Sequence, residues 1–146
     1  MPTEILFYSH RKDYAFLSNF YPSPIMIDGF HWPTVEHYYQ ASKTLDPVLR
    51  ERIRIASTPA EAKRFGRSIN PRKDWEKIKI KVMKKALWIK FTQNINLGVM
   101  LLGTGEAVLH EDSPHDRVWG IHGQDLLGKL LMEVRTGMRK GLADIL

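Results

Sequence analysis

The sequence contains no cysteine among its 146 residues. This absence excludes disulfide bonds, thiolate zinc sites and thiol nucleophiles, and it is compatible with a reducing compartment. Long apolar runs are also missing, and the charged N-terminal stretch has none of the features of a signal peptide or a membrane span. We therefore expect a cytoplasmic protein without a membrane partner.

Several motifs of common enzymes and metal sites are absent as well. No G-x-G-x-x-G follows a strand-like run and no G-x-x-x-x-G-K-[ST] occurs, which argues against a Rossmann dinucleotide site and against a P-loop. The nucleophile elbow of serine hydrolases is missing too. The six histidines show no metal-binding spacing, so we predict neither a metal nor a cofactor.

The composition and the length are those of a folded domain. Hydrophobic residues make up 43% of the chain and charged residues 26%, both within the ordinary globular range. The length is close to the commonest size of one domain. We therefore expect a single domain over residues 1–146.

The net charge of +6 is spread unevenly along the chain. Residues 50–90 hold 14 Lys or Arg against 4 Asp or Glu, and the rest holds 8 against 12. Such a basic region favours anionic partners, either a phosphorylated small molecule or nucleic acid, although a solvated helix face explains it equally well.

Apolar periodicity and turn residues predict an α+β fold that is mostly helical. The expected strands are 5–8, a hairpin of 25–27 and 30–32 around Asp28-Gly29, and 107–110. The expected helices are 34–43 with Pro33 in its first turn, 47–56 capped by Asp46, 59–65 ended by Gly66, 75–91, 95–102, and a last one from about 125 that Gly137 and Gly141 weaken.

The helix expected at 75–91 has two different sides. A buried apolar stripe is predicted from residues at helical spacing, namely Ile78, Val82, Ala86 and Ile89. A cationic outer side is predicted from Lys77, Lys81, Lys84 and Lys85. Trp88 is expected to pack in the core.

The first candidate for chemistry lies on the helix expected at 34–43. Glu36 and Lys43 are seven residues apart, which places them about 20° from alignment on an ideal helix. Tyr39 and Gln40 share this stripe, so that one face offers a carboxylate, a phenol, an amide and an amine. Most charged stripes are simply solvated, but the aromatic pair Tyr38-Tyr39 favours partial burial.

The second candidate is the segment 111–120, which crowds acidic groups, a histidine and an indole into ten positions. A polar surface loop anchored by the buried Trp119 is the simpler interpretation. The alternative is a loop that its own aromatic anchor holds over a site.

These segments resemble, in chain order, the motifs of the YbiA-like or NADAR family, and the likeness covers nearly the whole chain. The matching residues are Phe16-Leu17-Ser18-Asn19-Phe20, the twelve residues from Trp32 to Lys43, Gly66-Arg67, Asp74-Trp75, Val82-Met83-Lys84-Lys85-Ala86-Leu87, Lys90-Phe91, Asp116-Arg117-Val118-Trp119-Gly120 and the nine residues from Leu127 to Arg135.

The resemblance implies an N-glycosidase with an α+β fold. Some members of the family hydrolyse the phosphoribosylamino intermediates of riboflavin synthesis, and others remove ADP-ribose from guanine bases. The resemblance implies Glu36, Lys43 and Asp116 as catalytic residues. It implies a substrate-binding set of Ser18, Asn19, Phe20, Gln40, Arg67, Trp75, Trp119 and Gly120.

Roles within this set follow from the chemistry of the side chains. Trp75 and Trp119 are expected to stack on the base and Arg67 to hold a phosphate, while Asn19 either binds ribose hydroxyls or fixes its loop. One departure concerns the rim: relatives usually have a longer Gly- and Lys-rich segment before the last helix, where this chain has only residues 121–125.

Two mechanisms and three functions stay open at this level. Glu36 and Asp116 can share the work on the glycosidic bond, or Lys43 can attack the sugar and form an imine. The expected substrate is a phosphoribosylaminopyrimidine; the alternatives are ADP-ribosylated guanine in nucleotides or nucleic acid, and a non-catalytic module that binds ADP-ribose or a nucleotide. The pair of carboxylates argues against the last. No feature determines the oligomeric state.

Overall fold

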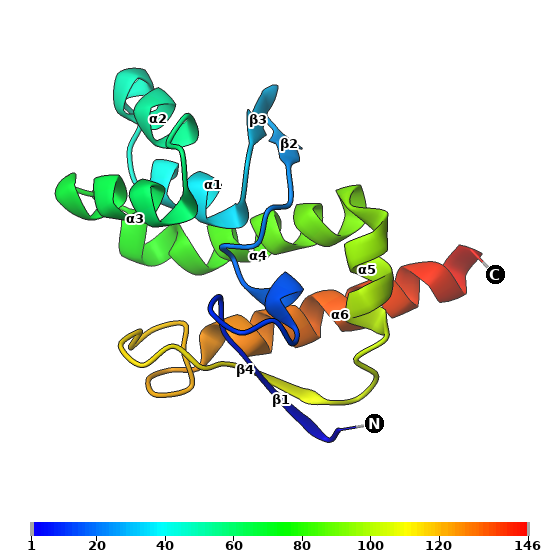
Figure 1. The fold of residues 1–146 in the computed structure, drawn as a ribbon. Coiled ribbons are helices and arrows are strands. Elements are labelled where there is room, and N and C mark those ends of the chain that lie inside the picture. The colour runs from blue at the N-terminus through cyan, green and yellow to red at the C-terminus, as the bar shows by residue number, and fades with distance from the viewer. Residues whose placement is uncertain (1, 146) are drawn as a thin grey trace. The chain divides into compact units, whose positions relative to one another are not determined.

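The computed structural model describes residues 2–145, with the side chains up to residue 141. Helices predominate and the strands are short, so the chain has the expected α+β fold (Figure 1). Its contacts form two units: a central unit, Pro22–Asn94, and a terminal unit, Met1–Tyr21 with Ile95–Leu146. A single domain over residues 1–146 stays a prediction. No helix within residues 2–145 has the length and the apolar character needed to cross a membrane.

The central unit opens with the predicted hairpin. β2 (Ile25–Ile27) pairs antiparallel with β3 (Phe30–Trp32). The turn residues Asp28 and Gly29 both adopt positive φ angles, of 54° and 83°. Two successive positive φ angles are what a type I′ turn requires, and this turn sets the register of the two strands.

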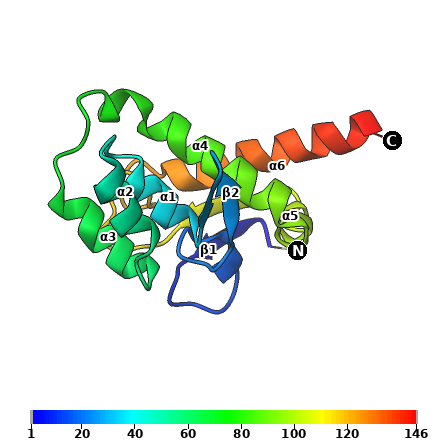
Figure 2. The same cartoon turned by 90° about the horizontal axis from the view of Figure 1, so that it is seen from above.

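Four helices complete the central unit: α1 (Val35–Ala41), α2 (Pro47–Arg54), α3 (Pro59–Ser68) and α4 (Trp75–Gln93). The side chains of Thr34, Asp46 and Thr58 cap the first three by accepting backbone N–H groups. Every residue of α1 is buried, and α1 contacts the other three helices (Figures 1 and 2). The short α1 is therefore the core element of this unit.

The predicted boundaries of α1, at both ends, and of α3, at its C-terminal end, were wrong. Thr34 is the N-cap of α1, so Pro33 precedes the helix, and Lys43 lies two residues beyond its end at Ala41. Gly66 does not end α3, which continues to Ser68. The glycine is instead placed where α3 approaches the side chain of Gln40 on α1.

The buried side of α4 also differs from the predicted stripe. Of the four residues expected in the core only Ala86 is buried, and the buried set is Trp75, Met83, Ala86, Leu87, Lys90 and Phe91. Trp88, expected in the core, is 42% exposed. Ile80 is exposed as well. Apolar residues occur on both sides of this helix, so their type alone did not identify the buried side. The four outer lysines are exposed as predicted.

The terminal unit is built on a pair of parallel strands that lie far apart in the sequence. β1 (Glu4–Phe7) pairs with β4 (Val108–Glu111), with Ile5 opposite Leu109. Both strands were predicted to within one residue at each end, but their pairing was not.

Helices surround this strand pair in the terminal unit. A short 3-10 turn, η1 (Ala15–Leu17), follows β1, and α5 (Ile95–Leu102) precedes β4. The last helix, α6 (Leu126–Ile145), packs on β4 and α5. The glycines at 137 and 141 lie within this helix and do not interrupt it; the weakening of its end stays a prediction.

His37 ties α1 to the connection between α2 and α3. Its side chain is 1% exposed; Nε2 lies 3.0 Å from the carbonyl oxygen of Ala56 and Nδ1 lies 2.8 Å from Oγ1 of Thr34. The carbonyl can only accept, so Nε2 donates, and Nδ1 of a neutral ring accepts from the threonine hydroxyl. Burial lowers the pKa of His37 below its ordinary 6.5.

The first prediction concerns the stability of this contact. The unfolded chain takes up a proton at His37 near pH 6.5, whereas the folded chain resists it, so stability is expected to fall as the pH decreases below 6.5. Urea unfolding at pH 7.5 and pH 5.5 measures this loss. His37→Gln should lower stability by about 1 to 3 kcal/mol at pH 7.5 and reduce the pH dependence. An equal pH dependence in the variant would contradict the assignment.

Candidate functional site

Glu36 lies in the first turn of α1 and is only 6% exposed. Its Oε1 accepts a hydrogen bond from Nε2 of Gln40 at 2.7 Å. The two residues are four apart on a helix, so the predicted shared face is confirmed for this pair. A buried carboxylate is costly without such partners.

Lys43 lies in the turn that follows α1 and is half-buried. Its charge interacts with that of Glu36, although the helical stripe from which the pair was predicted ends at Ala41. Burial lowers the pKa of the Lys43 amine, and the carboxylate of Glu36 opposes this effect. This turn is held by the segment between α3 and α4, because the backbone N–H of Arg72 donates to the carbonyl oxygen of Lys43 at 2.7 Å.

Cations gather around Lys43. Arg67 and Lys63 of α3 and Lys79 of α4 all lower the pKa of Lys43 through their positive charge. Arg67 is exposed, whereas Lys79 forms an ion pair with Glu76 at 2.6 Å. The predicted phosphate ligand Arg67 therefore belongs to a group of positive charges on one side of the central unit.

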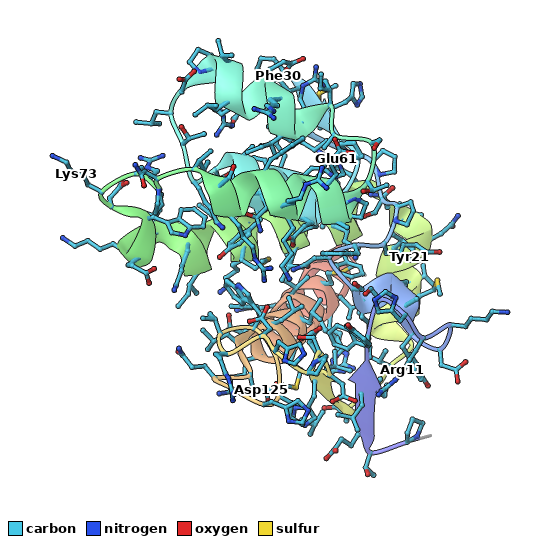
Figure 3. All side chains as sticks on the ribbon, turned by 60° about the vertical axis from the view of Figure 1, so that its left-hand side comes forward. Arg11, Tyr21, Phe30, Glu61, Lys73 and Asp125 are labelled. Atoms are coloured by element: carbon cyan, nitrogen blue, oxygen red, sulfur yellow. The ribbon has the colours of Figure 1, made fainter. Side chains whose placement is uncertain are left out.

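Basic side chains of the central unit also lie outside this group. Lys73, at the connection between α3 and α4, points away from the helices (Figure 3). A surface lysine of this kind is available to a long polyanion.

An aromatic pair lies beside Lys43. Tyr39 and Trp75 pack with ring centroids 5.1 Å apart at 58°, and the Nζ of Lys43 lies 5.8 Å from the Tyr39 centroid. Trp75 is 5% exposed. The predicted residues Glu36, Gln40, Lys43, Arg67 and Trp75 thus all come from neighbouring parts of the central unit. Five side chains that are spread over forty sequence positions share this region.

The other predicted catalytic residue, Asp116, lies in the terminal unit, where it organises its own loop. Its Oδ1 accepts hydrogen bonds from the backbone N–H groups of Val118 and Trp119, at 3.0 Å and 2.8 Å. Trp119 is 8% exposed, so the predicted aromatic anchor of the loop is present. Gly120 is buried, and a Cβ there would lie 2.8 Å from Glu111 Oε2 and 3.0 Å from the carbonyl oxygen of Asp116. A side chain at this position would therefore be tightly placed against the loop.

Ser18, Asn19 and Phe20 form a turn after η1 in the terminal unit. Oγ of Ser18 accepts from the backbone N–H of Phe20 at 3.1 Å, and Asn19 is 8% exposed. The hydroxyl of Ser18 therefore stabilises its own turn. The predicted set is divided accordingly: one group lies in the central unit, and Ser18, Asn19, Phe20, Asp116, Trp119 and Gly120 lie in the terminal unit.

Two polar features of interest had no predicted role. Lys90 on α4 is completely buried, and burial lowers the pKa of its amine to about 7. In the terminal unit, Nδ1 of His110 lies 2.7 Å from Oδ2 of Asp125, a pair fifteen residues apart that periodicity does not reveal.

Nothing in the described part of the chain suggests a resident metal. Among residues 2–141, whose side chains are placed, no three His, Asp or Glu side chains come together as metal ligands would. The charged side chains that shift the pKa of Lys43 are the carboxylate of Glu36 and three cations, Arg67, Lys63 and Lys79.

Comparisons with known proteins agree with this architecture. The sequence model of the NADAR domain matches residues 6–139. N-glycosidase YbiA of Escherichia coli strain K12 is 48% identical over 139 residues, which cover 91% of this chain and 87% of the relative. A riboflavin biosynthesis protein of Vibrio vulnificus strain YJ016 is 40% identical over 146 residues, which cover 96% of this chain and 40% of the relative.

The fold is shared with a solved structure as well. The NMR structure of the E. coli protein YbiA superposes with a TM-score of 0.88 and 45% identity, covering 98% of this chain and 89% of that one. The family match spans most of the chain, and the relatives are similar over nearly all of it. The chain therefore belongs to the NADAR domain family.

Proposed function

We propose that the chain is an N-glycosidase that hydrolyses the C–N bond between a phosphorylated ribose and a base, with phosphoribosylaminopyrimidine intermediates of riboflavin synthesis as its substrates. The names of its relatives, N-glycosidase and riboflavin biosynthesis protein, support this proposal. The observation that carries it is the buried carboxylate of Glu36 beside the Lys43 amine, whose pKa burial lowers. A cytoplasmic location belongs to the same proposal.

The reaction requires two kinds of help from the protein. As the C–N bond breaks, positive charge develops on C1 and on the ring oxygen of the ribose, and the departing nitrogen gains electrons. A carboxylate facing the sugar stabilises the first, and a proton donor assists the second. In the direct route, Glu36 and Asp116 take these two parts, and water attacks C1.

In the covalent route, Lys43 takes the first step. Its neutral amine attacks C1 of the ring-opened sugar, the bond from C1 to the base nitrogen breaks, and the base leaves with a proton. Water then hydrolyses the Lys43 imine and releases the sugar phosphate. A lowered pKa increases the fraction of neutral amine near pH 7. Glu36, beside Lys43, is the group to move the protons.

Binding of the phosphate is assigned to the cations around Lys43. Arg67 offers a planar guanidinium that can form two parallel hydrogen bonds to a phosphate. Trp75 presents an indole next to Tyr39 on which a base can stack. In the terminal unit, Trp119 has the same proposed role, and Asn19 is assigned to the ribose hydroxyls or to its own turn.

The second candidate function is removal of ADP-ribose from guanine in nucleic acid. The observation that favours it is the row of exposed lysines on the outer side of α4, Lys77, Lys81, Lys84 and Lys85. Such a row can follow a phosphate backbone, and each neutralised phosphate makes binding weaker as the salt concentration rises.

The deciding experiment offers both substrates to the purified protein. We expect release of ribose phosphate from phosphoribosylaminopyrimidine and little release of ADP-ribose from an oligonucleotide that carries an ADP-ribosylated guanine, measured by chromatography. For the small substrate, kcat/KM should change only a few-fold between 50 mM and 200 mM salt, since few phosphates are bound. Turnover of the ADP-ribosylated substrate with a steep salt dependence would favour the second candidate, and turnover of neither would refute both.

A further inference from the structure

Gly66 lies inside α3 at the point where this helix meets the Gln40 side chain of α1. A Cβ at position 66 would overlap Oε1 of Gln40 and would lie 2.7 Å from its Cδ and 2.9 Å from its Cβ. Glycine is unfavourable in a helix interior compared with alanine, so its presence here has a packing reason. That reason is the room it leaves for the Gln40 amide.

The Gln40 amide has one end bonded to Glu36 and the other end against Gly66. Nε2 donates to Oε1 of Glu36 at 2.7 Å, and Gln40 is 3% exposed. No group among the residues that the structure describes donates to Oε1 of Gln40. The reversed amide would place its oxygen against the carboxylate oxygen, so the carboxylate selects the orientation that the structure has.

We propose that Gln40 is a positioning residue that orients the Glu36 carboxylate for catalysis, and that Gly66 is required because only a glycine leaves room for the Gln40 amide. This inference rests on the proposed function, in which Glu36 acts on the glycosidic bond. It assigns the amide of Gln40 to the carboxylate, in place of the substrate contact expected from the sequence. Through Gly66 and Gln40, α3 thus influences the orientation of Glu36, which lies on α1.

The first test replaces the amide by an apolar group of similar length. Gln40→Met is expected to lower kcat by about 10- to 100-fold and to change KM by less than about twofold, because a misoriented carboxylate affects the chemical step more than binding. Ser42→Ala is the matched control: it removes a buried hydrogen bond on the same segment, from Oγ to the carbonyl oxygen of Tyr38 at 2.7 Å. Its kcat should stay within about twofold of wild type.

The second test asks whether Gly66 acts through Gln40. Gly66→Ala should lower kcat at least about tenfold in the wild-type chain. In a Gln40→Ala background the same change should cause a clearly smaller fold-loss, because the overlapping Oε1 and Cδ atoms are gone and only the contact with the Cβ of residue 40, at 2.9 Å, remains. Gly141→Ala, where a Cβ meets nothing within 4 Å, controls for the change of helix propensity. Equal losses from Gly66→Ala in both backgrounds would overturn the coupling.

A third measurement separates this inference from the proposed function. The NMR chemical shift of the Glu36 carboxyl carbon should move in Gln40→Met and in Gly66→Ala and stay in place in Ser42→Ala, whether or not the protein turns over any substrate tested. An unmoved shift in both variants would disprove the positioning role. A wild-type kcat in Gln40→Met would disprove its importance for catalysis while leaving the N-glycosidase proposal intact. If the wild-type protein is inactive on every substrate but the Glu36 shift moves in both variants, the positioning role stands and the proposed reaction is refuted.

Discussion

Replacing Glu36 by Gln is expected to lower kcat/KM for the phosphoribosyl substrate by about 1,000-fold, a loss typical of removing a charged group that faces the transition state. The change keeps the size of the side chain, and the new amide oxygen can still accept the hydrogen bond from Gln40. The fold should therefore survive, and the negative charge beside the sugar is what disappears. Initial rates of sugar phosphate release, with a thermal melt of the same sample, measure both properties.

The control for Glu36→Gln is a carboxylate of the same unit that lies outside the site. Glu51 on α2 is exposed and bonds to Arg54. Surface ion pairs of this kind contribute little to stability, so Glu51→Gln should leave both the rate and the melting temperature nearly unchanged. If Glu36→Gln retains more than about a third of the wild-type kcat/KM while the control behaves as expected, Glu36 is not a catalytic residue.

Replacing Lys43 by Arg is expected to abolish turnover, with at least about a 1,000-fold fall in kcat, because a guanidinium keeps the positive charge but cannot act as an amine nucleophile. If Lys43 only binds a phosphate, Lys43→Arg should instead raise KM by a few-fold and preserve kcat. Lys63→Met is the matched control, since Lys63 belongs to the same group of cations. It should weaken binding without preventing the reaction.

The covalent route leaves a chemical trace that does not depend on rates. Borohydride added during turnover should reduce the imine and attach the sugar phosphate to Lys43, which mass spectrometry of the digested protein can locate. The pH dependence provides a second check: only the neutral amine attacks, so kcat/KM should rise with pH and level off below the pH at which an ordinary lysine loses its proton, because burial lowers the pKa of Lys43. No adduct and an active Lys43→Arg enzyme would together leave the direct route.

Local signals in the sequence were sufficient wherever neighbouring residues decide the structure. The Asp28-Gly29 turn specified its hairpin, and Asp46 and Thr58 capped the helices predicted to follow them. These features depend on backbone angles and hydrogen bonds within a few residues, so short-range rules predict them. The Glu36–Gln40 contact belongs to the same class, because a spacing of four on a helix is a local property.

Contacts between distant segments were decided by the tertiary structure alone. The parallel pairing of β1 with β4 and the burial of Lys90 in place of Trp88 depend on which surfaces meet, and no periodicity encodes this. Gly66 shows the difference most clearly. In the sequence a glycine near the end of a helical stretch predicts a stop, but in the folded chain the same residue gives the Gln40 amide its room. The amino-acid order thus determined the elements and the family motifs, whereas the packing of α3 on α1 decided which atoms surround Glu36.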